Sequence, residues 1–593
     1  MMARARPFEE EISLIMLKLY LRYFKQYTGQ VILGILCTLL FTFAMMALPT
    51  LSKNVIDKGA IAQDNGVIMR YALFMLVDAL ICAVAGIMSN YFTSGVVMSA
   101  VRDMRNTLFE RVVHFSQEDE GKIGTASLIS RQSKDIQTSQ TAMVQMFLMM
   151  LQAPLMCVAG IVLAIRTSKT LSWIIVILLP LATLVMLIAV KLARPVFREN
   201  QIKVDHVNRI MREALTGMRV IRAFNREDYE TDRFAGVSDD YTDNAKKGFM
   251  IMNSLLPFIM FFANASNLLI LGFGARYMKE GIATYGAVQA YILYTTMILM
   301  SFMVASMFLM ILPNAQAAAE RINEVWDVEP TIVWKEDAVK LPEVGNASIE
   351  VSHISYRFPG ASQNVLTDIS FSAKAGETVA IIGGTGSGKT TLLNMLCRNM
   401  DVVEGSVKID GVDVRDTDPE DLRNHISLVP QKSFLFSGSI IDNVRFGKSD
   451  ATDEEVKHAL DVSQSTAFVE EKEYGMYTFI AQGGSNVSGG QKQRLAIARA
   501  LVRKADIYIF DDSFSALDFK TDAKLRKELS NELTKAVTII VAQRVSTIKN
   551  ADRILVLEEG KVVGDGTHEE LLASNKVYRE IAMSQLSESE VGA

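Results

Sequence analysis

Long apolar stretches alternate with polar connections over the first 312 residues of the chain. Each stretch has the length of about 20 largely apolar residues that an α-helix needs to cross the hydrocarbon core of a bilayer. The stretches cover residues 30–52, 67–93, 141–166, 171–192, 250–275 and 283–312. This pattern predicts an all-α domain of six membrane-spanning helices.

The connections between these stretches differ in length and charge. Residues 94–140 and 193–249 are long and basic, whereas the connections near 53–66, 167–170 and 276–282 are short. Because Lys and Arg accumulate in cytoplasmic loops, we expect both long connections and both termini in the cytoplasm. The sequence therefore predicts a multi-pass protein of the cell membrane.

The stretch before the first span is amphipathic. Lys18, Arg22 and Lys25 fall on one helical face of an otherwise apolar stretch, residues 12–24. Such a pattern suits a helix that lies in the inner membrane interface. An ordinary N-terminal extension of the first span is the alternative.

A different pattern begins near residue 346. Residues 348–358 alternate between apolar and polar, and residues 378–382 form a continuous apolar run. Short strand patterns follow at 426–429, 506–511 and 537–541, with amphipathic helical segments between them. Strands that alternate with helices predict an α/β domain with a mainly parallel sheet.

Composition supports a division of the chain into two domains. Of the 31 methionines, 27 precede Met395, and the net charge of −5 gives no indication of nucleic-acid binding. Four cysteines lie far apart, so neither a disulfide framework nor metal-ligand spacing emerges. We expect a transmembrane domain over residues 1–327, a linker over 328–346 and a nucleotide-binding domain over 347–593.

Residues 383–390 (GGTGSGKT) match the phosphate-loop pattern G-x-x-x-x-G-K-[ST] in full. In such a loop, backbone N–H groups and a helix N-terminus surround phosphates, and a lysine such as Lys389 adds a positive charge. The Thr390 hydroxyl can reach Mg²⁺, and the apolar run before Asp511 delivers a carboxylate to a metal-bound phosphate. These residues predict binding of ATP with Mg²⁺.

A second motif makes the resemblance to a known family specific. Residues 486–494 (NVSGGQKQR) are close to the signature L-S-G-G-Q of the ATP-binding cassette (ABC) superfamily. The chain resembles a half-transporter of the exporter type, with the membrane domain fused before the nucleotide domain, over nearly its whole length. The resemblance implies an ATP-hydrolysis-coupled transmembrane translocase whose nucleotide domain is cytoplasmic.

Several residues of this chain stand at positions that have a known role in the family, and the resemblance implies the same role for each. The resemblance implies that Tyr356, expected as an exposed ring ahead of a strand, stacks on adenine; plain packing against the sheet is the alternative. It also implies that Gln431 touches Mg²⁺ together with Thr390 and Asp511, and that residues 515–518 form the loop between two sites. The second coupling helix of the exporters is similar to residues 216–227, and residues 114–122 are placed like the first. The residues expected to contact nucleotide are Tyr356, Gly383, Gly384, Thr385, Gly386, Ser387, Gly388, Lys389, Thr390, Thr391, Ser488, Gly489, Gly490 and Gln491.

Two residues depart from the family pattern. Asp512 stands where the family has a glutamate that polarises water, and Gln543 stands where it has a histidine. We therefore expect Asp512, Gln543 and Gln431 to form a weakly hydrolytic centre. Beside an intact signature, these departures match one half of an asymmetric heterodimer, in which a partner half-transporter supplies the competent site opposite residues 488–491.

The sequence says less about the cargo. Met300, Met303, Met307 and Met310 share one face of the last span and can line an adaptable cavity, although core packing and lipid contact are alternatives. Asp78 is an ionisable residue inside the second span, where a role in substrate binding and a position near a membrane face are the alternatives. We expect a small amphipathic or drug-like substrate. A homodimeric exporter of lipid or peptide, and a nucleotide-gated channel or regulator, remain alternatives.

Overall fold

The computed structural model describes residues 16–342 and 348–585. The chain forms two compact units. The first comprises Met1–His114 and Ile123–Val328, and the second comprises Phe115–Lys122 and Glu329–Ala593, each as far as it is described. Most of the expected linker, from residue 329 to 342, therefore belongs to the second unit, and residues 343–347 lie outside the described part.

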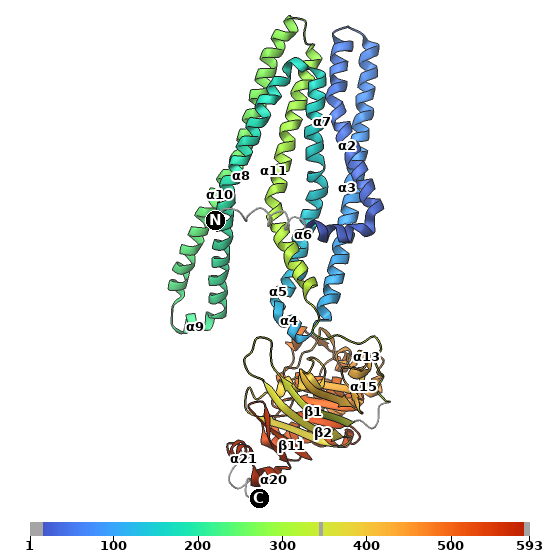
Figure 1. The fold of residues 1–593 in the computed structure, drawn as a ribbon, viewed down its shortest axis with the longest axis vertical. Coiled ribbons are helices and arrows are strands. Elements are labelled where there is room, and N and C mark those ends of the chain that lie inside the picture. The colour runs from blue at the N-terminus through green and yellow to red at the C-terminus, as the bar shows by residue number, and fades with distance from the viewer. Residues whose placement is uncertain (1–15, 343–347, 586–593) are drawn as a thin grey trace. The chain divides into compact units, whose positions relative to one another are not determined.

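The first unit is helical throughout (Figure 1). Its long helices are α2 (Thr28–Asn54), α3 (Asn65–Val113), α7 (Gln152–Thr167), α8 (Ser172–Thr216), α10 (Glu227–Lys279) and α11 (Tyr285–Asp327). Its shorter elements are η1 (Lys25–Tyr27), η2 (Val55–Ala60), α5 (Thr125–Ser130), η3 (Arg131–Asp135), α6 (Ile136–Gln145), η4 (Met146–Met150), η5 (Lys169–Leu171) and α9 (Met218–Ala223). Figure 1 shows α2 and α3 side by side, and α8 and α10 as a second long pair.

Within the described residues, five helices are long and apolar enough to cross a membrane. They correspond to five of the six expected spans. The remaining one, residues 141–166, is divided, because the π-helical turn η4 separates α6 from the 16-residue helix α7. Residues 16–24 are also helical: their aromatic side chains are buried, whereas Lys18 and Arg22 are exposed together with Leu17 and Leu21.

Close packing in the first unit depends on small and polar side chains, as is common between membrane helices. The Thr38 hydroxyl on α2 and the Ser89 hydroxyl on α3 are hydrogen-bonded at 2.7 Å. Gly160 on α7 faces Ile298 on α11 so closely that an added Cβ would lie 2.7 Å from it. The Tyr294 hydroxyl is buried and donates to the Met46 carbonyl over 3.1 Å.

The second unit is an α/β domain. Its strands are β1 (Ser348–Tyr356), β2 (Leu366–Lys374), β3 (Thr378–Gly383), β4 (Glu404–Ile409), β5 (Val412–Asp413), β6 (Ile426–Val429), β7 (Gly438–Ser439), β8 (Phe479–Ile480), β9 (Ile507–Asp511), β10 (Val537–Val541), β11 (Arg553–Glu558) and β12 (Lys561–Gly566). Its helices are α4 (Gln117–Ile123), α12 (Lys389–Leu396), α13 (Pro419–His425), α14 (Ile440–Arg445), α15 (Asp453–Val462), α16 (Thr466–Glu470), η6 (Gly475–Tyr477), η7 (Gln482–Gly484), α17 (Gly489–Leu501), α18 (Phe519–Glu532), α19 (Val545–Ile548), α20 (His568–Ser574) and α21 (Lys576–Met583).

The main sheet has the order β12-β11-β3-β10-β9-β6. All of its strands from β11 to β6 are parallel, and only β12 at the edge is antiparallel. The expected parallel α/β core is thus confirmed, because β3, β6, β9 and β10 lie at the expected positions. Ligands of open parallel sheets bind beyond the carboxyl ends of the strands. The segments after β3, β10, β9 and β6 meet at that edge.

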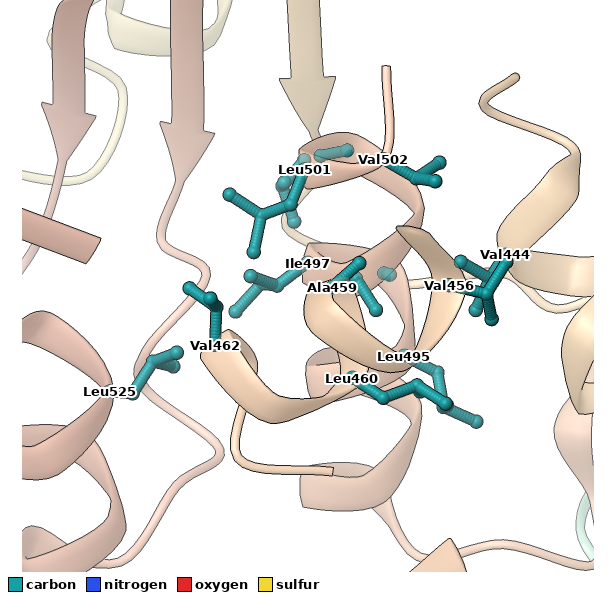
Figure 2. Close-up of a cluster of buried hydrophobic side chains, with 14 of the residues drawn as sticks. Val444, Val456, Ala459, Leu460, Val462, Leu495, Ile497, Leu501, Val502 and Leu525 are labelled. Carbon is teal, nitrogen blue, oxygen red and sulfur yellow. The ribbon is translucent and has the colours of Figure 1, made fainter. Parts of the chain in front are cut away.

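A helical region packs beside this sheet. Figure 2 shows its apolar centre, where side chains of α14, α15, α17 and α18 meet. Helix α15 begins with a capping box, in which the Thr452 hydroxyl accepts from the Glu455 N–H and the Glu455 carboxylate accepts from the Thr452 N–H. Buried residues such as Leu460 and Leu495 hold α15 against α17. This packing fixes the helix whose N-terminus carries the signature motif.

Residues 329–342, which we call the strap, are bound to the surface of the second unit. The Arg398 guanidinium lies 3.9 Å from the centre of the Trp334 ring and donates to the Val333 carbonyl over 3.0 Å. At the other end, the His425 Nε2 lies 2.9 Å from the Pro342 carbonyl oxygen. The strap is therefore an ordered part of this unit over its described length.

Candidate nucleotide-binding site

The phosphate loop connects the buried strand β3 to α12. Gly386 and Gly388 have φ values of 82° and 98°, which favour glycine. A Cβ on Gly388 would also lie 2.6 Å from the Leu366 Cδ2, and one on Gly383 would lie 2.2 Å from the Leu557 carbonyl oxygen. The glycines of the motif are therefore required by backbone conformation and by close packing.

Lys389 places its ammonium group inside this loop. The Nζ donates to the carbonyl oxygens of Gly383 at 2.9 Å and Gly384 at 2.7 Å. Burial lowers the pKa of Lys389, while the nearby charges of Asp511 and Asp512 act in the opposite direction. The loop therefore combines a fixed positive charge with the N-terminus of α12, an arrangement suited to phosphate.

Asp511 ends β9 and is 9% exposed. Burial and the negative charge of Asp512 raise the pKa of Asp511, and Lys389 partly opposes them. β9 pairs with β10 in parallel, with Asp511 opposite Val541. A carboxylate beside Lys389 and the phosphate loop can balance the charge of the lysine or bind a metal cation there.

Asp512 and Gln431 lie together, as the sequence predicts. The Gln431 Nε2 donates to the Asp512 Oδ2 over 3.3 Å. The Asp512 backbone N–H donates to the Val541 carbonyl oxygen over 2.8 Å, and its φ of 46° is left-handed. Left-handed backbone is costly for most side chains and is tolerated best by Asn and Asp after glycine. An aspartate is thus well suited to this position.

Gln543 follows β10, two residues after the carbonyl that Asp512 contacts. Its side chain is exposed, and its backbone carbonyl oxygen accepts a hydrogen bond from Gln585. β10 lies between β3 and β9 in the sheet. The topology therefore places Gln543 at the same sheet edge as the phosphate loop and Asp511.

The signature motif forms the start of α17. Ser488 is the N-cap, and its hydroxyl accepts from the Gln491 N–H over 3.3 Å while the Gln491 Oε1 accepts from the Ser488 N–H over 3.0 Å. The hydroxyl proton of Ser488 is left to donate to another acceptor. Ser488 and Gly489 are exposed, and a Cβ on Gly490 would lie 3.2 Å from the Ala516 carbonyl oxygen. This helix start can serve as an anion site on the domain surface.

Two family models match the chain over these regions. Residues 31–302 match the model of the ABC transporter transmembrane region, and residues 366–515 match the model described as ABC transporter. An uncharacterized ABC transporter ATP-binding protein of Mycobacterium tuberculosis is 37% identical over 98% of this chain and 100% of its own length. The chain belongs to the ABC exporters.

Other relatives of the exporter carry names that differ in cargo. An ATP-dependent lipid A-core flippase of Desulfotalea psychrophila is 33% identical, covering 82% of this chain and 86% of the relative. A probable multidrug resistance ABC transporter ATP-binding/permease protein of Bacillus subtilis is 30% identical over 94% of this chain and 95% of the relative. ATP-driven transport is common to these names.

The exporter's Tyr356 differs from expectation in its exposure. It is the last residue of β1 and only 4% exposed, so the expectation of an exposed ring ahead of a strand is wrong. The ring packs edge-to-face on Phe358, with centroids 5.2 Å apart. Burial raises the pKa of Tyr356 to about 12, and Glu118 adds to this rise. Its proposed contact with adenine stays a prediction.

The donor chemistry of the exporter's site fits Mg²⁺. Thr390, Asp511 and Gln431 offer hydroxyl, carboxylate and amide oxygens, which are ligands that Mg²⁺ prefers. Within the described ranges, no group of three or more His, Cys, Asp or Glu residues could hold a metal ion. In nucleotide sites, Mg²⁺ is usually held by one or two protein ligands together with the phosphates. A bound Mg²⁺ would neutralise phosphate charge there.

Sequence reasoning missed several residues that support the site. The Ser433 hydroxyl donates to the Gln493 Oε1 over 2.9 Å, and an Arg499 N–H donates to the Phe434 carbonyl over 2.9 Å. These bonds join the loop after Gln431 to α17. The partners are 60 or more positions apart, so no local pattern could have revealed them.

Proposed function

We propose that the chain is one subunit of a heterodimeric ABC exporter with one degenerate and one competent ATP site. The observation that carries this proposal is the pair of departures, Asp512 and Gln543, at the same sheet edge as an intact phosphate loop. ATP would be sandwiched between the phosphate loop of one subunit and the signature of the other. This chain would contribute its weak catalytic centre to one site and Ser488 to the other.

The length of the side chain supports weak hydrolysis at Asp512. Aspartate is one methylene shorter than glutamate, and displacement of a catalytic group by about 1 Å can cost on the order of a hundredfold in rate. The carboxylate also accepts from Gln431 at 3.3 Å. A shorter side chain that is already held by an amide is poorly placed to polarise water.

Gln543 weakens the site in a different way. Its amide can still donate to a γ-phosphate, but it cannot become cationic as a histidine can. Stabilisation of charge that develops in the transition state would be reduced. Phosphate binding, which depends on the loop and Lys389, would be kept. The site would therefore hold ATP and turn it over slowly.

We propose amphipathic or drug-like compounds as cargo. The methionine-rich spans and the relative named as a probable multidrug resistance transporter support this substrate class. Met300 and Met303 are described side chains, whereas the side chains of Met307 and Met310 lie outside the described ones. Unbranched, polarizable methionines adapt to varied apolar shapes.

A homodimeric lipid exporter is the second candidate. It is favoured by the relatives named ATP-dependent lipid A-core flippase, of which one is 27% identical over 99% of this chain. In that case Asp512 would act as an adequate catalytic carboxylate, and both sites would be alike.

Purification of the full chain without a partner distinguishes the two candidates. We expect it to bind MgATP and to hydrolyse it little, and we expect the chain recovered from its native host to carry a second half-transporter. Robust ATP turnover by the isolated chain, free of contaminating ATPase, would instead support the homodimer.

A further inference from the structure

The C-terminal helix α21 packs beneath the loop that carries Gln543. Tyr578 and Ala582 on α21 are fully buried in one apolar cluster with Ala542 and Val545. The Tyr578 hydroxyl lies 2.6 Å from the His568 Nδ1, which ties α21 to α20. These contacts place Ser584 and Gln585, the described residues that follow α21, beside the loop after β10.

One side chain beyond α21 bridges that loop. The Gln585 Nε2 donates to the Gln543 carbonyl oxygen over 2.8 Å. The Gln585 Oε1 accepts from the Val545 N–H over 2.9 Å. A glutamine amide has both a donor and an acceptor in one plane, so it can satisfy both backbone groups at once. Asparagine is one methylene shorter, and glutamate lacks the donor.

The loop is thus held on both sides of Gln543. On one side, the Val541 carbonyl oxygen accepts from the Asp512 N–H over 2.8 Å. On the other side, the Gln585 amide contacts residues 543 and 545. Residues 541–545 connect the Asp512 contact to the start of α19. They are therefore held by hydrogen bonds from Asp512 at one end and from Gln585 at the other.

We propose that Gln585 is a positioning residue that sets the backbone from which Gln543 reaches the γ-phosphate. This inference rests on the proposed role of Gln543 in ATP binding. Gln585 acts through the loop and does not contact the nucleotide itself. Loss of its donor would let residue 543 move, and loss of its acceptor would free the Val545 N–H.

Three variants separate the hydrogen bond to Gln543 from the hydrogen bond to Val545. Each is made in the full-length exporter and purified with any subunit that accompanies it. Gln585→Ala removes both, and Gln585→Glu keeps the acceptor for Val545 while it removes the donor to Gln543. Ser584→Ala is the matched control, because the Ser584 hydroxyl donates only within its own helix, to the Ile581 carbonyl. Melting temperature is measured for each variant to identify loss of folding.

Two readouts follow. Hydrogen–deuterium exchange without nucleotide should show faster exchange of the Val545 amide in Gln585→Ala and normal protection in Gln585→Glu and Ser584→Ala. The time for which MgATP stays on this chain, followed by photo-crosslinking of a labelled ATP analogue, should fall roughly threefold to tenfold in both Gln585 variants, the change expected from one lost hydrogen bond. Ser584→Ala should resemble wild type.

A double mutant shows whether Gln585 acts through Gln543. In a Gln543→Ala background, Gln585→Glu should shorten ATP retention no further. Unchanged retention in folded Gln585→Ala and Gln585→Glu, or an equal loss in the Gln543→Ala background, would overturn the proposal. ATPase rates report separately on the proposed function: a high rate for the isolated chain would reject the degenerate site, and Gln585 would then be assessed by the same exchange and retention measurements.

Discussion

At the scale of single residues, Ser488 and Asp512 should differ in importance. Ser488→Ala should reduce the ATPase activity of the complex at least a hundredfold, because removal of a donor aimed at developing charge costs about 3–4 kcal/mol. Asp512→Asn should cost less than about tenfold if that carboxylate is poorly placed, as the degenerate-site proposal requires. Steady-state ATPase rates beside wild type measure both effects.

The reverse balance would contradict the degenerate-site proposal. A homodimer has one kind of site, so Asp512→Asn should then be about as damaging as Ser488→Ala. Ser485→Ala, an exposed position just before the motif, is a suitable control for nonspecific effects on the helix start.

Restoring the family residues should have a limited effect. Asp512→Glu with Gln543→His should raise ATPase activity only in part, because the partner's signature must also be competent. The left-handed φ of 46° at residue 512 adds a conformational cost for glutamate. Activity is compared for the single and double variants in the complex, and full activity at the second site from this chain's changes alone would count against the asymmetry.

At the scale of elements, the packing of α15 on α17 should determine the stability of the second unit. Leu460→Ala creates a cavity in the cluster of Figure 2 and should cost about 2–5 kcal/mol. The melting temperature of the nucleotide unit should fall by roughly 5–15 °C. Lys457→Ala, an exposed change on the same helix, is the matched control and should leave melting nearly unchanged.

The elements themselves were predicted well where the pattern is local. β3 and β9 are continuous apolar runs that end in a glycine and a carboxylate, and both lie at the expected residues. The π-turn at Met146–Met150 was not predictable, because it interrupts an apolar stretch whose hydropathy does not change. Tyr356 was misjudged because Phe358 packs on it, and because α4, from much earlier in the sequence, belongs to the same unit.

The candidate site shows the same limit. The phosphate loop, Asp511, Asp512 and the signature were found because their motifs are short and contiguous. Gln585 was not found, because its two hydrogen bonds join positions 40 and 42 residues apart with no motif between them. The burial of the Tyr356 ring and the hydrogen bond of Ser433 to Gln493 are likewise determined by tertiary packing.

At the scale of the whole molecule, His425 should make stability depend on pH. Burial disfavours its charged form, but the Asp421 and Pro342 carbonyls and the Asp506 carboxylate outweigh this and raise its pKa above 6.5. Both ring nitrogens face carbonyl oxygens at 2.9 Å, and only the imidazolium can donate to both. The stabilisation that protonated His425 adds to the free energy of unfolding is fully present below pH 6.5. It is lost as the pH rises through the raised pKa.

Melting temperature measured from pH 6 upward tests this expectation. Wild type should lose stability relative to His425→Gln as the pH rises, because glutamine does not titrate. An unchanged difference between the two proteins across this range would show that the imidazolium does not hold the strap. His458→Gln, whose exposed ring pairs with Glu532, serves as the control.

The strap also determines where a fragment that contains the second unit should begin. Arg398 is almost fully buried, and the strap supplies two of its contacts, the Val333 carbonyl and the Trp334 ring, beside the Asp401 carboxylate and the Val414 carbonyl. A fragment that begins at residue 347 would lack both strap contacts, so one guanidinium N–H would lose its acceptor and the ring that covers the charge would be missing, which is costly. A fragment that begins at Glu329 keeps them. For biochemical work on the second unit, the N-terminal boundary therefore belongs at Glu329, 19 residues before the start of β1 at Ser348, because residues 329–342 are part of that unit.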